Sequence, residues 1–69
     1  MIRYNGVTYN EYDDDQMRDL AKAMNAEISI HGNGVKITFE DPGTLYDMSF
    51  TGRTISEAMR RAIAGGVCN

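Results

Sequence analysis

The fold is decided by residues 27–40, which read EISIHGNGVKITFE. In the first half two isoleucines alternate with polar residues, and in the second half Val35, Ile37 and Phe39 do the same. Alternation with a period of two is typical of strands that bury one face. The glycines and the asparagine at 32–34 are typical of a turn. The stretch therefore predicts a β-hairpin with one apolar face.

A second hairpin is predicted at the N-terminus, around Asn5-Gly6. A two-residue type I′ turn needs positive φ at both central positions, and Asn-Gly tolerates this better than other pairs. Closing the turn there leaves one apolar and one polar face. The predicted pairs are Ile2 with Tyr9, Arg3 with Thr8, and Tyr4 with Val7.

A helix is predicted from about Asp14 to Asn25. Its apolar residues recur at the spacing i, i+3, i+4 and i+7, which places them on one helix face. An aspartate among residues 13–15 can cap the first turn. The apolar face consists of Met17, Leu20, Ala21 and Met24.

A third strand and a last helix follow the central hairpin. Asp41-Pro42-Gly43 predicts a turn, and the strand after it has Tyr46, Met48 and Phe50 on one face. Thr54-Ile55-Ser56-Glu57 has the form of a capping box, in which Thr and Glu side chains each satisfy a free N–H group at a helix start. The helix then buries one stripe and stops at two glycines. The stripe and the stop are Ile55, Ala58, Met59, Ala62, Ile63 and Gly65-Gly66.

The predicted order is strand, strand, helix, strand, strand, strand, helix. The simplest packing is an α+β domain in which two helices cover one face of an antiparallel sheet. Residues 1–69 form a single domain, which buries roughly 60% of the surface of its unfolded chain.

Composition narrows the class of protein. Hydrophobic residues make up 42% and charged residues 25%, close to globular averages. No apolar run approaches the roughly 20 residues of a membrane span, and no signal-peptide core is present, so we expect a cytoplasmic protein without membrane partners. The single cysteine, Cys68, agrees with a reducing compartment and has no neighbouring group that would activate it.

The strongest functional signal is a run of carboxylates near the N-terminus. The net charge is −3, and residues 1–19 hold five acids against two arginines, so they carry all of the excess. Helix capping accounts for one or two of these acids. Two tyrosines flank the run, and aromatic residues beside charge are typical of interface anchors. We therefore expect a partner-binding face made of Glu11, Tyr12, Asp13, Asp14, Asp15 and Asp19.

An alternative binding set is basic. Nucleic acid would be bound through clustered cations, and direct binding is disfavoured because the whole chain is acidic. The candidate residues for this alternative are Lys36, Arg53, Arg60 and Arg61.

Enzyme chemistry has little support in the sequence. His31 is the only histidine and lies beside a predicted turn, where we expect it to be exposed. The serines lack a nucleophile-elbow setting. The aspartates at 13–15 do not have the alternating spacing of a calcium loop, so no metal or other cofactor is expected.

Two resemblances rest on particular residues. Residues 50–62, Phe-Thr-Gly-Arg-Thr-Ile-Ser-Glu-Ala-Met-Arg-Arg-Ala, resemble the strand-to-helix signature of HicB-type antitoxin domains, with Gly52, Thr54 and Glu57-Ala58 at the matching positions. From residue 14 onward the element order also resembles a double-stranded RNA-binding domain. That family has a lysine-rich motif where this chain has Thr54-Ile55-Ser56-Glu57, which argues against RNA binding.

At the level of class, a tiny, acidic domain without catalytic residues is similar to phage-encoded inhibitors of the anti-CRISPR type. This resemblance implies a non-enzymatic module that blocks a basic, nucleic-acid-binding surface of a host protein or protein–nucleic-acid complex. In that case the chain acts in the host cytosol. The sequence leaves open whether it forms a homo-oligomer.

Overall fold

The computed structural model describes residues 1–40 and 47–67. The predicted turn at Asp41-Pro42-Gly43, the predicted strand residue Tyr46 and the lone Cys68 lie outside the described residues. The α+β order is the predicted one. The elements are β1 (Ile2–Tyr4), β2 (Val7–Tyr9), α1 (Asp14–Ala23), β3 (Glu27–His31), β4 (Gly34–Glu40), β5 (Asp47–Gly52) and α2 (Ile55–Ala64).

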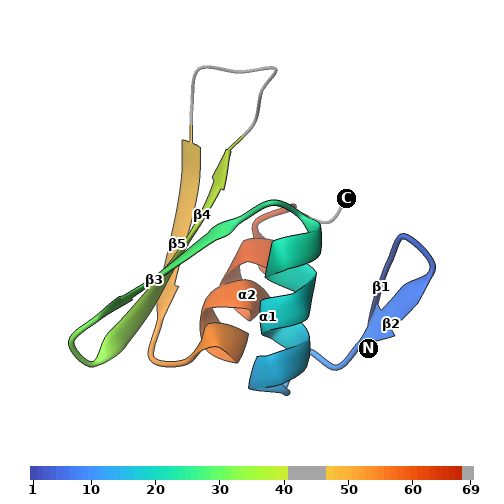
Figure 1. Ribbon diagram of the computed structural model, residues 1–69, viewed down its shortest axis with the longest axis horizontal. Coiled ribbons are helices and arrows are strands. Elements are labelled where there is room, and N and C mark those ends of the chain that lie inside the picture. The colour runs from blue at the N-terminus through green and yellow to red at the C-terminus, as the bar shows by residue number, and fades with distance from the viewer. Residues whose placement is uncertain (41–46, 68–69) are drawn as a thin grey trace.

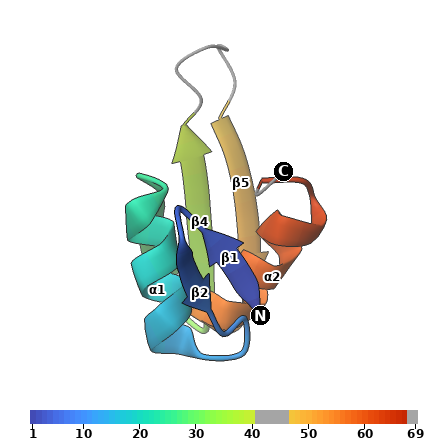
Figure 2. The same ribbon diagram turned by 90° about the vertical axis from the view of Figure 1, so that its right-hand side faces the viewer.

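These elements form three layers. Strands β3, β4 and β5 make an antiparallel sheet in that order, and both helices pack on one of its faces (Figure 1). The β1–β2 hairpin is a separate two-stranded sheet on the other side of the helices, in front of the line between α1 and α2 (Figure 2). The helix pair is therefore covered from two sides, while no described helix covers the outer face of β3–β5.

Both hairpins have short turns. In β1–β2 the register is the predicted one, and Asn5 and Gly6 have φ of 50° and 81°, as a type I′ turn requires. In β3–β4 the loop has only two residues, because Gly34 already pairs with His31 as the first residue of β4. Only the first loop residue, Gly32, has positive φ, at 54°, which is the pattern of a type II′ turn. The predicted three-residue turn was one residue too long.

The helices begin and end as their caps dictate. Asp13 accepts a hydrogen bond from the Gln16 N–H and Thr54 accepts one from the Glu57 N–H, so each caps a helix. The other half of the predicted capping box differs: in residues 47–67, the Glu57 carboxylate lies 3.4 Å from the Arg61 guanidinium. Two residues beyond each helix, the chain adopts a left-handed φ, 59° at Asn25 and 94° at Gly66, with the hydrogen bonds of a Schellman motif.

The core lies between the sheet and the helices. Phe39 meets Phe50 edge to face at 6.0 Å between ring centroids. Two residues on the predicted apolar face are less buried than the alternation suggests, since Ile30 is 71% and Met48 45% exposed. Both lie near strand ends, away from the buried centre of the sheet. The described core consists of Met17, Leu20, Ala21, Val35, Ile37, Phe39, Ile55, Ala58, Met59 and Ala62.

The described part of the chain contains neither a membrane-spanning helix nor a cluster of metal-binding side chains. Neither of its helices has the length and hydrophobicity needed to cross a membrane. Within residues 1–40 and 47–67, no three His, Cys, Asp or Glu side chains come together as a metal site would require.

Candidate functional site

The six residues of the predicted partner-binding face, which we call the acidic face, lie around the start of α1. The loop before the helix is held by Asn10 and Gln16. Asn10 Oδ1 accepts from the Tyr12 N–H at 3.0 Å, and Gln16 Oε1 accepts from the Asn10 N–H at 2.7 Å. Sequence reasoning missed both residues. The available signal was the Asp13-x-x-Gln16 spacing, which is that of a capping box with aspartate in place of serine or threonine.

Tyr12 is the exposed centre of the loop. It is 72% exposed, and the Arg60 guanidinium of α2 lies 4.8 Å from the centroid of its ring. Arg60 also donates to the main-chain oxygen of Glu11 at 3.1 Å. One cation therefore fixes both the loop and the tyrosine ring, which reduces the entropy that Tyr12 would lose on binding a partner.

Asp14 acts across the fold. Its Oδ1 accepts from the N–H of Ser56, 42 residues away, at 3.0 Å. Ser56 belongs to the first turn of α2, where N–H groups lack a partner within the helix. Asp14 therefore caps the second helix while Asp13 caps the first, and the positive ends of both helix dipoles compensate the acidic residues.

We expect Asp14→Ala to lower the free energy of unfolding by about 1 kcal/mol, the usual cost of a lost helix cap. Asp14→Asn keeps an oxygen acceptor and should lose less. Asp19→Ala is the matched control, because Asp19 is exposed on the same helix, and its effect should stay within about 0.5 kcal/mol. Urea unfolding followed by circular dichroism measures all three. Equal losses for Asp14→Ala and Asp19→Ala would contradict the assignment.

Glu11 pairs with the amino terminus. Its Oε2 atom is shielded from water and lies 2.7 Å from the Met1 amino nitrogen, close enough for an ion pair although not aligned as a directed hydrogen bond. This contact with the amino group holds the pKa of Glu11 below its ordinary value of 4.5, with further help from its own main-chain N–H and from Arg60. Glu11 is thus satisfied within the molecule.

The lowered pKa of Glu11 makes stability depend on pH. A carboxyl whose pKa is lower in the folded state stabilises the fold above its unfolded pKa and loses that effect as the pH falls through the folded value. We expect the stability difference between the protein and Glu11→Gln to be constant at neutral pH and to shrink below 4.5. Urea unfolding across that range measures it. A difference that grows towards acid pH would contradict the ion pair.

The two remaining acids point to solvent. The Asp15 side chain is 89% exposed and 3.5 Å from Arg18, and Asp19 is exposed one turn later. Surface pairs of this kind contribute little to stability. Tyr12, Asp15 and Asp19 are therefore the members of the acidic face that the described contacts leave most accessible to a partner.

The alternative basic residues are spread over the fold. Arg60 is held by Glu11 and Tyr12, while Arg61 donates to the main-chain oxygen of Thr51 at 3.0 Å and pairs with Glu57. Arg53 is exposed in the turn before α2, and Lys36 is exposed on β4. The structure thus places two of the four cations in contacts within the chain.

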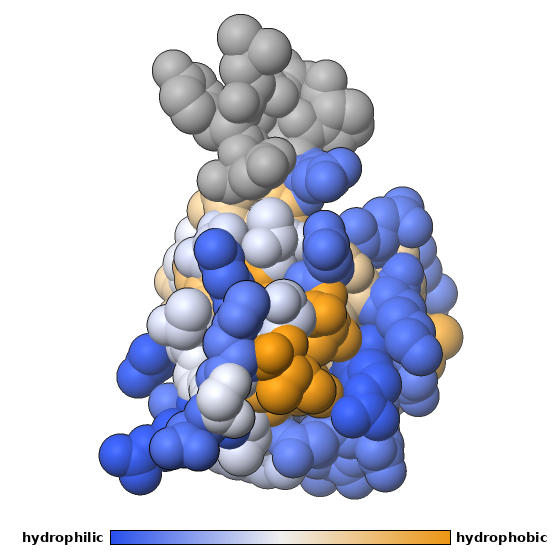
Figure 3. Space-filling view, turned by 60° about the vertical axis from the view of Figure 1, so that its left-hand side comes forward, coloured by the Kyte–Doolittle hydropathy of each residue, from blue (hydrophilic) through white to orange (hydrophobic). Residues whose placement is uncertain are grey.

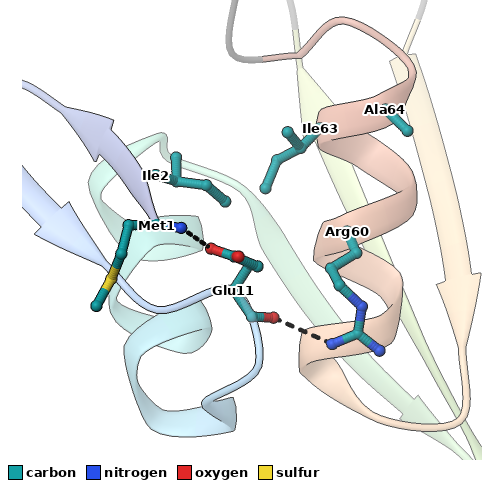
Figure 4. A pocket seen from close by; sticks show the side chains of 6 residues that line it. All are labelled: Met1, Ile2, Glu11, Arg60, Ile63 and Ala64. Atoms are coloured by element: carbon teal, nitrogen blue, oxygen red, sulfur yellow. Dashed lines mark hydrogen bonds and ion pairs between the residues drawn. The ribbon is translucent and has the colours of Figure 1, made fainter.

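A pocket of about 320 Å³ lies between the N-terminal hairpin and α2 (Figure 4). Its three charged groups are already engaged: the Met1 amino terminus pairs with the Glu11 carboxylate, and the Arg60 guanidinium donates to the Glu11 main chain. A nucleophile with an adjacent base is not part of this lining. It consists of Met1, Ile2, Glu11, Arg60, Ile63 and Ala64.

His31 is exposed at the end of β3, as predicted. Its Nε2 lies 2.7 Å from Ser29 Oγ on the outer face of the sheet, a contact that the sequence reading did not anticipate. A catalytic pair also needs a group that orients the histidine. None of the described carboxylates pairs with His31 within this chain.

Comparison with protein-family models, characterised proteins and solved structures finds no match for this chain.

Proposed function

We propose that this protein is a non-enzymatic protein-binding module that acts in the cytoplasm as an inhibitor. It docks the acidic face on a basic surface of a host protein or protein–nucleic-acid complex. Such a surface normally binds a phosphate backbone, and a carboxylate face can compete for the same cations.

The observation that supports this most is the setting of Tyr12. The Tyr12 side chain is 72% exposed, and exposing an aromatic ring to water costs free energy. The ring nevertheless lies against Arg60, on a loop with four internal hydrogen bonds. Rigid, exposed aromatic residues next to charge are typical of binding hot spots. The net charge of residues 1–19 supplies the long-range attraction to a cationic partner.

The proposal is best tested with substitutions of residues that do not stabilise the fold. Three acidic residues stabilise the fold itself: Glu11 pairs with the amino terminus, and Asp13 and Asp14 cap the starts of α1 and α2. Changing them would therefore affect folding and binding together. Tyr12→Ser and the double variant Asp15→Lys/Asp19→Lys alter the accessible members alone. Glu40→Lys is the matched control for each charge reversal, because Glu40 is exposed on β4, outside the acidic face.

The experiment is affinity capture from host lysate with the protein and these variants, each first shown to unfold with an unchanged midpoint. The proposal expects the same captured protein with the unmodified chain and with Glu40→Lys, and its loss with Tyr12→Ser and Asp15→Lys/Asp19→Lys. Capture that survives the double reversal would refute the acidic face as the binding site.

A gel-shift titration separates this proposal from the basic alternative. Nucleic-acid binding through Lys36 and Arg53 would shift DNA or RNA at low salt, with a steep loss of affinity as salt rises. The inhibitor proposal expects no shift by the protein alone.

A further inference from the structure

The two edges of the β3–β4–β5 sheet differ. Arg61 donates to the main-chain oxygen of Thr51 on β5 and so covers part of that edge with a charged side chain. The other edge is β3, which among the described strands pairs only with β4. Natural sheets usually protect exposed edges with charge, proline or a covering element. Strand β3 has one charged residue at its start, Glu27, and also carries Ile30, which at 71% is the most exposed large hydrophobic side chain of the described strands β3–β5.

The main chain of β3 has N–H and C=O groups that can pair with a further strand. A two-residue hairpin closes on a pair that exchanges both hydrogen bonds, and such pairs alternate along an antiparallel ladder. Since His31 opposite Gly34 is the closing pair, residues 27, 29 and 31 bond to β4. Ile28 and Ile30 therefore turn their N–H and C=O groups towards the free edge.

The sequence of β3 is complementary to itself. Around a two-fold axis at Ser29, an antiparallel copy sets Ile28 opposite Ile30 and Glu27 opposite His31, each twice. The isoleucine pairs are then the hydrogen-bonded ones, which matches the groups that face the edge. Each Glu27 carboxylate can accept from the free ring nitrogen of the opposite His31, whose Nε2 is already engaged by Ser29.

We propose that β3 is a dimerisation edge, which pairs in antiparallel fashion with β3 of a second copy and joins two three-stranded sheets into one. The isologous contact buries Ile30 of both copies. A hydrophobic patch interrupts the polar surface on the sheet side of the molecule (Figure 3), and Ile30 is exposed on β3. The Glu27–His31 hydrogen bonds across the strands then set the register.

The register is tested by a single cysteine. In a Cys68→Ser background, Ser29→Cys places two thiols at the axis, where Cα atoms of a non-bonded pair are about 4.5 Å apart, inside the range for a disulfide. Ser49→Cys is the matched control, because Ser49 is also an outer-face serine with a side-chain hydrogen-bond partner, on the opposite edge strand. The proposal expects oxidation to convert Ser29→Cys into a covalent dimer and to leave Ser49→Cys monomeric. Equal cross-linking of both, or none of Ser29→Cys, overturns it.

Sedimentation equilibrium tests the energetics. The unmodified chain should show a species of twice 7.7 kDa that dissociates on dilution. Ile30→Lys and His31→Glu should each weaken the dimer by about tenfold, because each change acts twice across the axis. The double variant Glu27→Lys/His31→Glu places a lysine opposite a glutamate in each pair and should recover the dimer to within about threefold. A chain that stays monomeric at all concentrations, or a dimer that ignores these changes, overturns the proposal.

Discussion

Gly52→Ala is expected to destabilise the protein by about 3 kcal/mol, the upper end for a group forced into a packed interior. A Cβ atom at Gly52 would lie 2.6 Å from the main-chain nitrogen of Ala58 and 3.0 Å from the Cβ of Glu57. These atoms belong to the start of α2, so the helix itself would have to move. A domain of 69 residues has roughly 3 to 10 kcal/mol of total stability, so the loss removes much of it.

Gly34→Ala is the control for Gly52→Ala. Gly34 lies on the neighbouring strand, and a Cβ there would meet its nearest atom, the Gly52 oxygen, at 3.4 Å, an ordinary contact. We expect its stability to stay within about 1 kcal/mol of the unmodified protein, on either side. Urea unfolding at one temperature compares the two. Equal stability of the two variants would mean that α2 moves away from β5 at little cost.

Met59→Ala should cost about 3 kcal/mol, because it removes a side chain with no exposed surface and leaves a cavity between α2 and the sheet. Met48→Ala removes the same atoms at a position that is 45% exposed, where the environment is partly water already. We expect it to cost about 1 kcal/mol.

Thermal unfolding of both methionine variants measures the difference. Met59→Ala should melt well below Met48→Ala, and similar melting temperatures would place the core elsewhere. The prediction is independent of dimerisation, since neither methionine lies on β3.

Much of the fold could be predicted because its signals are local. The Asn5-Gly6 turn sets the β1–β2 register, and the apolar spacing of Met17, Leu20 and Ala21 sets the buried face of α1. The position of the hairpin on the far side of the helices has no such signal. It depends on how Tyr4 and Tyr9 pack against the core, which is tertiary information.

The candidate site was less predictable, because it too depends on contacts between segments that are distant in the sequence. A count of carboxylates suggested one binding face, but Asp14 is bonded to Ser56 through an interaction that spans 42 residues. Arg60, named from the sequence only as a candidate for nucleic-acid binding, contacts the Glu11 main chain and the Tyr12 ring. Such contacts become visible only when distant segments are brought together, so the sequence overstated how many acids are available to a partner.

The hydrogen bonds between residues 10–14 and α2 affect the dynamics of the molecule. Arg60 and Asp14 bond the loop to the C-terminal helix at two separate points. If the last helix detaches, the loop loses both anchors, so the two segments should open as one cooperative unit rather than fray independently. A partner that binds Tyr12 would then slow amide hydrogen exchange in the first turn of α2, although that turn is distant from Tyr12 in the sequence.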